Sequence, residues 1–211
     1  MTKLCVIGLG YIGFPTACMF AMSGIEVVGV DINTEIVQTL QNGKLHIYEN
    51  GLVQAANEAF ASGRFRISDR VEKADAFIIA VPTPFYDDKK ADMRAVISAT
   101  ESILPVLQSG NLVVLESTSP PKTTTDLVQP ILEKTGLIAG KDFYLAYSPE
   151  RVLPGQILRE LIENDRVIGG INFESARAGR DLYQTFVKGQ IFLTNSTTAE
   201  MVKLMENTFR D

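Results

Sequence analysis

Two polar residues close to the end of the sequence, Lys203 and Asn207, are four positions apart. The segment around them has an apolar stripe of helical period, and residues at this spacing lie on one face of a helix. An ammonium and an amide placed together can stabilise a developing alkoxide or oxyanion. The alternative is a solvent-exposed face on which Glu200 and Lys203 form a surface ion pair beside an exposed Asn207.

Three more polar segments follow apolar runs of strand length, and each contains proline. They are residues 81–84 (Val-Pro-Thr-Pro), 116–121 (Glu-Ser-Thr-Ser-Pro-Pro) and 147–151 (Tyr-Ser-Pro-Glu-Arg). Ligands of an open parallel sheet bind beyond the carboxyl ends of its strands, so the hydroxyls and carboxylates of these segments are candidates for chemistry. Proline lowers the entropic cost of ordering such a loop around a ligand. For any single loop, turn formation and helix capping by Ser and Thr is at least as good an interpretation.

A glycine pattern near the start of the chain predicts a nucleotide site. Gly8-Leu9-Gly10-Tyr11-Ile12-Gly13 is a G-x-G-x-x-G that follows an apolar run, and Asp31 ends the next such run. In a dinucleotide-binding turn, the first glycine permits the tight turn, the second admits a pyrophosphate, and the third allows close helix packing. The carboxylate can bind both hydroxyls of an adenosine ribose and repels a 2′-phosphate, so NAD is expected rather than NADP. The alternative is a glycine-rich strand-to-helix turn with a surface aspartate.

The hydrophobic pattern predicts the elements that must position these residues. Apolar runs of strand length alternate with longer segments of helical period, which indicates a parallel sheet covered by helices on both faces. We expect eight strands, at residues 3–7, 26–30, 64–67, 75–81, 112–115, 143–146, 166–168 and 191–193. Helices are expected at about residues 11–23, 34–41, 93–107, 173–186 and 197–211. For three further helices one end is predicted: one ends at residue 62, one begins near residue 121, and one ends at about residue 162. The predicted fold class is α/β, a Rossmann-type doubly wound and mostly parallel sheet.

Composition excludes several classes of protein. The chain has 211 residues, 45% of them hydrophobic and 21% charged, so it can bury a sizeable core. Its 25 acidic and 20 basic residues give a net charge of −5, and we expect neither nucleic acid nor membrane as a partner. No apolar stretch approaches the roughly 20 residues that cross a bilayer, and we expect a cytoplasmic protein. Cys5 and Cys18 are the only cysteines and His46 the only histidine, which disfavours disulfides and a metal site.

Taken together, these features resemble the UDP-glucose/GDP-mannose dehydrogenase family over essentially the whole chain. The matching motifs, in chain order, are Gly8 to Gly13, Asp31, residues 81–84, 116–118 and 148–150, and Lys203 with Asn207. Within the family, residues 150–156 look most like the members that oxidise UDP-N-acetyl-D-mannosamine. The resemblance implies an NAD-binding domain at residues 1–196 and the truncated start of a central dimerisation helix at 197–211. It also implies a UDP-sugar substrate and a homodimer of the full-length protein.

Members of this family oxidise the C6 alcohol of a nucleotide sugar to a carboxylate with two NAD⁺ in succession. The resemblance implies that Thr118 helps to place a water, that Glu150 acts as acid or base in thioester hydrolysis, and that Lys203 and Asn207 hold the C6 oxygen. The cofactor-binding residues that it implies are Gly8, Gly10, Tyr11, Ile12, Gly13, Asp31, Val81, Thr83 and Thr118.

The sequence departs from the family pattern at three places. Pro154 stands where UDP-glucose dehydrogenases often carry a second glutamate, and His46 replaces a common proline and is expected to be a solvated loop residue. The family's thiol nucleophile lies beyond the helix that carries Lys203. Cys5 and Cys18 lie in predicted core elements and lack the setting of a reactive thiol. We therefore expect these residues to be the amino-terminal half of a longer enzyme, inactive alone.

Two other functions stay open at this point. One is a standalone NAD-binding module without catalysis. The other is a hydroxyacid dehydrogenase of the 6-phosphogluconate type, which also combines a glycine turn with a lysine and an asparagine on a helix. The second alternative does not account for residues 81–84 or 148–150.

Overall fold

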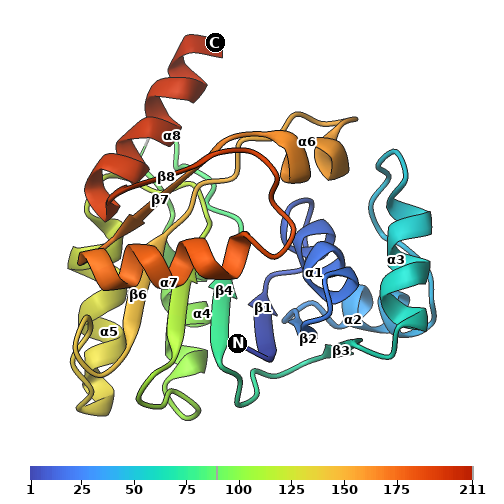
Figure 1. Cartoon of the computed structure of the whole chain (residues 1–211), viewed down its shortest axis with the longest axis horizontal. Coiled ribbons are helices and arrows are strands. Elements are labelled where there is room, and N and C mark those ends of the chain that lie inside the picture. Colours follow the sequence, from blue (N-terminus) through green and yellow to red (C-terminus); the bar gives the residue numbers. More distant parts are fainter. Residues whose placement is uncertain (89, 211) are drawn as a thin grey trace.

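The computed structural model describes residues 1–88 and 90–210, and eight strands in this part of the chain form one sheet (Figure 1). The strands are β1 (Lys3–Ile7), β2 (Glu26–Val30), β3 (Phe65–Ser68), β4 (Ala76–Ile79), β5 (Leu112–Leu115), β6 (Tyr144–Tyr147), β7 (Arg166–Gly170) and β8 (Ile191–Asn195). Their order across the sheet is β3-β2-β1-β4-β5-β6-β7-β8. Only the pairing of β6 with β7 is antiparallel among these strands. The predicted α/β fold with a mostly parallel sheet is confirmed.

Helices cover both faces of this sheet. They are α1 (Gly13–Met22), α2 (Thr34–Gln41), α3 (Leu52–Ala61), α4 (Arg94–Ile103), α5 (Gln129–Leu132), α6 (Ile157–Glu163), α7 (Phe173–Tyr183) and α8 (Ser196–Arg210), with a π-helical turn η1 (Thr124–Val128) leading into α5 and a 3₁₀ turn η2 (Glu133–Thr135) following it. Apolar side chains of α1, α3 and α7 pack on one face, and those of α4, η1 and α5 pack on the other. In Figure 1, α7 accordingly lies in front of the strands and α4 behind them.

The alternation along β1 shows why its residues form a central strand. Leu4 and Val6 belong to the core on one face, whereas Cys5 and Ile7 belong to the core on the other. A strand buried on both faces is typical of parallel sheets. Burial raises the pKa of the Cys5 thiol to about 12, and it does the same for Cys18 in α1. Both cysteines are therefore unreactive core residues, as predicted.

The structure differs from the predicted elements mainly at their ends. Helix α1 begins at Gly13 rather than near Tyr11, because the chain is still turning at residues 10–12. The helix predicted from Pro121 begins only at Thr124 as η1. Lys122 has a φ of +71°, which a right-handed helix cannot contain. Helix α8 begins at Ser196, and Asp211, the last residue predicted for it, lies outside the described residues.

The sheet topology gathers the polar segments at one edge. Because β1 to β6 are mutually parallel, their carboxyl ends lie at the same edge, and the amino-terminal end of antiparallel β7 joins them there. This edge carries the glycine turn after β1, Asp31 after β2 and the loops after β4, β5 and β6. Among the described residues, no helix is long and apolar enough to span a membrane.

Candidate functional site

The glycine turn has a geometry that side chains would disrupt. Gly8 has a φ of +95°, and a Cβ added to it would lie 2.7 Å from the carbonyl oxygen of Ala80. A Cβ on Gly13 would lie only 1.9 Å from the carbonyl oxygen of Gly8. A Cβ on Gly10 would meet no atom of the described residues within 4 Å, so Gly10 faces open space. The turn is therefore tight at Gly8 and Gly13 and leaves room for a ligand at Gly10.

The amides of the turn and the carboxylate of Asp31 lie side by side at this sheet edge. Within the described residues, the backbone N–H groups of Gly10, Tyr11 and Ile12 donate no hydrogen bond, and they immediately precede α1. Free amides at a helix start bind phosphate oxygens. The carboxylate of Asp31 accepts hydrogen bonds from the amides of Leu9 at 2.8 Å and Asn33 at 2.9 Å. These bonds fix the carboxylate beside the turn.

A cavity of about 630 Å³ opens at this edge, within the size range of small-molecule and cofactor sites. Gly8, Gly10, Asp31 and Val81 line it, so four of the predicted cofactor-binding residues meet there. The rest of the lining is mostly apolar and includes Ala99 of α4. The open space at Gly10, the free amides and the apolar wall fit the adenosine diphosphate half of NAD. The role of each residue in binding stays a prediction.

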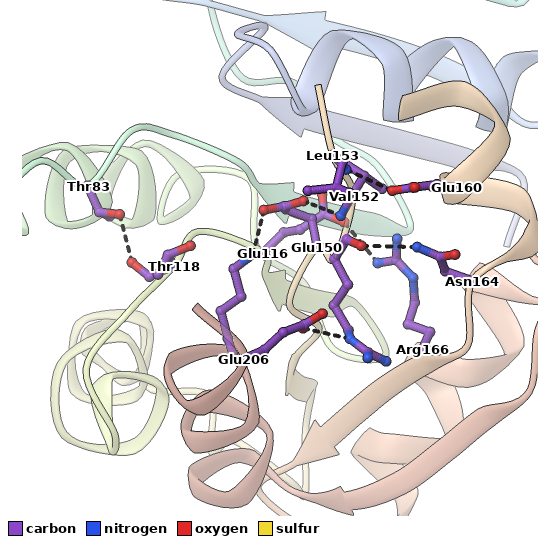
Figure 2. Close-up of polar contacts among 12 residues, drawn as sticks. Thr83, Glu116, Thr118, Glu150, Val152, Leu153, Glu160, Asn164, Arg166 and Glu206 are labelled. Atoms are coloured by element: carbon purple, nitrogen blue, oxygen red, sulfur yellow. Dashed lines mark hydrogen bonds and ion pairs between the residues drawn. The ribbon is translucent and has the colours of Figure 1, made fainter. Parts of the chain in front are cut away.

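Two threonines connect the loops that follow β4 and β5. The hydroxyl of Thr83 donates to the carbonyl oxygen of Thr118 at 2.7 Å (Figure 2). The hydroxyl of Ser117 donates to the carbonyl oxygen of Val81 at 2.7 Å. Thr83 and Thr118 also line a second hollow of about 330 Å³ together with Leu204 of α8. The structure thus places both predicted threonines between the glycine turn and α8.

Lys203 is buried and forms an ion pair with Glu150, not with Glu200. Its Nζ lies 2.7 Å from Oε1 of Glu150, and the residue is 3% exposed. The second oxygen of Glu150 accepts a hydrogen bond from the Val152 amide at 2.9 Å. Asn207 lies one turn further along α8 and is half-buried. The alternative of a surface ion pair beside an exposed asparagine is therefore wrong.

Glu200 instead holds α8 against the turn after β5. It is fully buried, and its carboxylate accepts hydrogen bonds from the amides of Lys122 at 2.5 Å and Thr124 at 2.8 Å. The hydroxyl of Thr124 donates to it at 2.6 Å. Burial raises the pKa of Glu200, and the hydrogen bonds from Thr124 oppose that rise. Because Lys203 follows Glu200 by less than one helical turn, this contact also fixes the position of Lys203 relative to the turn after β5.

Sequence reasoning missed a buried charge at the start of β7. Arg166 is 4% exposed, and its Nη1 lies 3.0 Å from Oε1 of Glu116. The same nitrogen donates to the hydroxyl of Ser148 at 3.0 Å. Burial raises the pKa of Glu116, and the positive charge of Arg166 opposes that rise. The one available signal was an arginine that opens an otherwise apolar strand.

His46 and Glu49 were also missed, and the prediction of a solvated His46 is wrong. Nε2 of His46 lies 2.8 Å from the carbonyl oxygen of Leu9, because the loop packs against the glycine turn. Glu49 is 4% exposed and accepts hydrogen bonds from the Tyr11 hydroxyl at 3.0 Å and the Gly155 amide at 2.9 Å. Burial alone would raise the pKa of Glu49, but the hydrogen bonds outweigh it, and the net shift is downward. The segment therefore connects the glycine turn to the loop that follows β6.

Comparison with known proteins adds a family assignment for most of this chain. Residues 2–187 match the family model described as the UDP-glucose/GDP-mannose dehydrogenase family, NAD binding domain. The matched range contains the glycine turn, Asp31 and the loops after β4, β5 and β6.

Individual relatives resemble the chain over its whole length. A UDP-N-acetyl-D-mannosamine dehydrogenase of Methanococcus aeolicus is 52% identical over 214 residues, which cover 100% of this chain and 48% of the relative. The structure of the UDP-N-acetyl-mannosamine dehydrogenase Cap5O from Staphylococcus aureus superimposes with a TM-score of 0.96 at 50% identity, covering 99% of this chain and 51% of that one. A UDP-D-ManNAc dehydrogenase from Pyrococcus horikoshii gives a TM-score of 0.96 at 46% identity over 99% of this chain and 50% of that one. The chain thus spans about half the length of these relatives.

Proposed function

The chain belongs to the UDP-glucose/GDP-mannose dehydrogenase family and carries its NAD-binding domain, and we propose that it serves an NAD-dependent UDP-sugar 6-dehydrogenase. The proposed enzyme oxidises the C6 alcohol of UDP-N-acetyl-D-mannosamine to a carboxylate, because relatives with that name are up to 52% identical to the chain. The observation that carries the proposal is the buried Lys203–Glu150 ion pair, which lies at the same sheet edge as the glycine turn. A buried ion pair loses the hydration of both charges, and its place beside the glycine turn favours an enzyme over a binding module.

The residues around the 630 Å³ cavity would hold the cofactor. The free amides of Gly10, Tyr11 and Ile12 bind the diphosphate, and the carboxylate of Asp31 orients the adenosine ribose. Val81, Thr83 and Thr118 lie along the remaining path toward α8. NAD⁺, when bound, supplies the hydride acceptor.

Lys203 and Asn207 act on the oxygen at C6, and Glu150 lies beside Lys203. Loss of hydride from an alcohol requires the oxygen to give up its proton, which passes to a water molecule, and to carry negative charge on the way. The ammonium of Lys203, shielded from water, opposes that charge, and Asn207 donates a hydrogen bond to the same oxygen. Glu150 orients the lysine through their ion pair and acts as acid or base in the later thioester hydrolysis, for which Thr118 helps to place the water.

We also propose a homodimer contact through α8 and a cytoplasmic location. Three apolar residues on α8 are exposed: Met201 by 45%, Met205 by 62% and Phe209 by 93%. An apolar face of this kind is typical of a protein contact. Free, buried cysteines are typical of a reducing compartment.

The experiment is an NADH assay with the complete gene product. We expect two NADH for each UDP-N-acetyl-D-mannosamine and less turnover with UDP-glucose. NAD⁺ binding by calorimetry without turnover of either sugar would favour a non-catalytic module instead. Turnover of small hydroxyacids would favour the 6-phosphogluconate type of enzyme.

A further inference from the structure

We propose that Arg166 is a positioning residue that sets the spacing between the loops bearing Thr118 and Glu150. The inference rests on the proposed function, because it concerns the two side chains that this function places at the reacting centre. Arg166 itself touches neither of them among the contacts of the described residues. It acts through the residues from which the two loops begin.

Arg166 reaches both loops with one nitrogen atom. It is the first residue of β7, and because β7 runs antiparallel to β6, it lies at the carboxyl ends of β5 and β6. Its Nη1 donates to Oε1 of Glu116 at 3.0 Å and to Oγ of Ser148 at 3.0 Å. Glu116 directly follows β5, and Ser148 directly follows β6. The backbone pairing of Leu115 with Tyr147 sets the separation of the two strand ends. The shared donor adds a side-chain link between the first residues of the two loops.

In both loops, the proposed functional residue lies equally close in sequence to the residue that Arg166 contacts. Thr118 comes two residues after Glu116, and Glu150 comes two residues after Ser148. With so short a connection, a shift of either loop origin moves the side chain that follows it. Figure 2 shows Glu116, Glu150 and Arg166 gathered at this place. Displacements of about 1 Å in a catalytic group can cost roughly 100-fold in rate.

The Arg166 contacts with Glu116 and Ser148 are buried. Arg166 is 4% exposed, Glu116 is 2% exposed and Ser148 is fully buried. The ring of Tyr183 lies 4.3 Å from the guanidinium carbon, and its hydroxyl donates to the same oxygen of Glu116 at 3.2 Å. The Tyr183 hydroxyl also contacts Ser148, so Arg166, Glu116, Ser148 and Tyr183 form one buried network that holds the guanidinium in place.

Stability alone does not explain the pair. A buried ion pair is often no more stabilising than apolar residues of similar volume, because both charges lose their hydration. The second oxygen of Glu116 is buried and has no hydrogen-bond partner among the described residues, which adds to that cost. What apolar residues cannot supply is a fixed donor that two loops share. The geometry is therefore better explained by the positions that Arg166 fixes.

The test compares two hydroxyl deletions at the same buried pair, both made in the complete gene product. Ser148→Ala removes the link to the Glu150 loop and leaves the Arg166–Glu116 pair in place. Tyr183→Phe removes a hydroxyl that contacts Glu116 and Ser148, and leaves both hydrogen bonds of Arg166 in place. We expect kcat with UDP-N-acetyl-D-mannosamine to fall about 10-fold or more in Ser148→Ala and to stay within about 2-fold in Tyr183→Phe. The Kd for NAD⁺ should be unchanged in both variants, and their melting temperatures should be similar.

A crystal structure of Ser148→Ala gives a readout that needs no turnover. We expect the Glu150 carboxylate to move out of hydrogen-bond reach of Lys203, from which it lies 2.7 Å away in the unmodified chain. Unchanged geometry would overturn the inference, and so would equal losses of kcat in the two variants. A natural protein that turns over no UDP-sugar would instead refute the proposed function, while the crystal structure would still decide the role of Arg166.

Discussion

Lys203 and Glu150 form a 2.7 Å ion pair across 53 residues of sequence, and this pair connects α8 to the loop after β6. A second contact between the same two elements joins Nε of Arg151 to Oε2 of Glu206 at 2.8 Å. Helix α8 is therefore held over the sheet edge by two ion pairs with this loop. Lys203 is thereby fixed at the same sheet edge as the glycine turn.

The Lys203 ammonium is expected to contribute to the transition state rather than to cofactor binding. In the complete gene product, Lys203→Met should lower kcat by about 100-fold to 1,000-fold, because it removes a preorganised charge from a water-excluded site. Calorimetry of the same variant should give an unchanged Kd for NAD⁺. The control is Lys134→Met, which removes a lysine that is 60% exposed and pairs only loosely with Glu101, 3.8 Å away. Equal activities of the two variants would contradict the role of Lys203.

Asp31 is expected to determine the choice between NAD⁺ and NADP⁺. Asp31→Asn keeps an oxygen for the Leu9 amide but loses the charge, so the Kd for NAD⁺ should rise about 10-fold. The preference against NADP⁺ should weaken at the same time, because the repulsion of a 2′-phosphate is gone. Asp69→Asn is the matched control, since Asp69 is another carboxylate in the lining of the same cavity. The measurement is titration calorimetry with both cofactors, and an unchanged ratio of the two affinities would disprove the prediction.

Two glycines of the turn should separate binding from stability. Gly10→Ala adds a methyl group where no atom of the described residues lies within 4 Å, so the melting temperature should stay unchanged while NAD⁺ binding weakens about 10-fold. Gly13→Ala places the methyl group 1.9 Å from the Gly8 oxygen and should lower the free energy of unfolding by about 1 to 3 kcal/mol. Urea denaturation and calorimetry test both variants. Loss of stability in Gly10→Ala would show that the space at Gly10 is not open.

The sheet could be predicted from sequence because its signal is local. The alternation along β1 and the glycine turn after it depend only on neighbouring residues, and each recurs as predicted in the structure. The predicted ends of helices and strands were less accurate where a single residue interrupts the hydrophobic pattern. Lys122, with its positive φ, delays the start of η1 in this way.

The buried charges could not be predicted, because their partners are distant in sequence. Glu200 bonds to Thr124 across 76 residues, and Arg166 pairs with Glu116 across 50. Charged residues are rarely buried unless paired, so a charge whose partner lies far along the chain looks like a surface residue. The same reason explains why the alternative interpretation of Glu200 and Lys203 was wrong, since their close spacing indicated a pair that the fold does not make.

The contact between Glu49 and the loop after β6 should make stability depend on pH. The pKa of Glu49 is lowered from its ordinary value of 4.5 by hydrogen bonds that exist only in the folded chain. Such a group stabilises the folded state above its unfolded pKa, and the contribution is lost as pH falls through the lower folded value. Glu49→Gln leaves an amide group facing the N–H groups of Gly155 and Ile157, so at pH 7 it should cost about 1 to 3 kcal/mol.

The difference in unfolding free energy between the natural chain and Glu49→Gln should therefore be constant from about pH 6 to 8 and should shrink below about pH 4.5. Denaturant titrations across that range measure it. Glu58→Gln serves as the control, because Glu58 is exposed on α3 and its hydrogen bond among the described residues comes from Gln54, one helical turn away, so it should show no such loss. A difference that grows as the pH falls would mean that the carboxylate of Glu49 is not the ionised acceptor for the Gly155 amide.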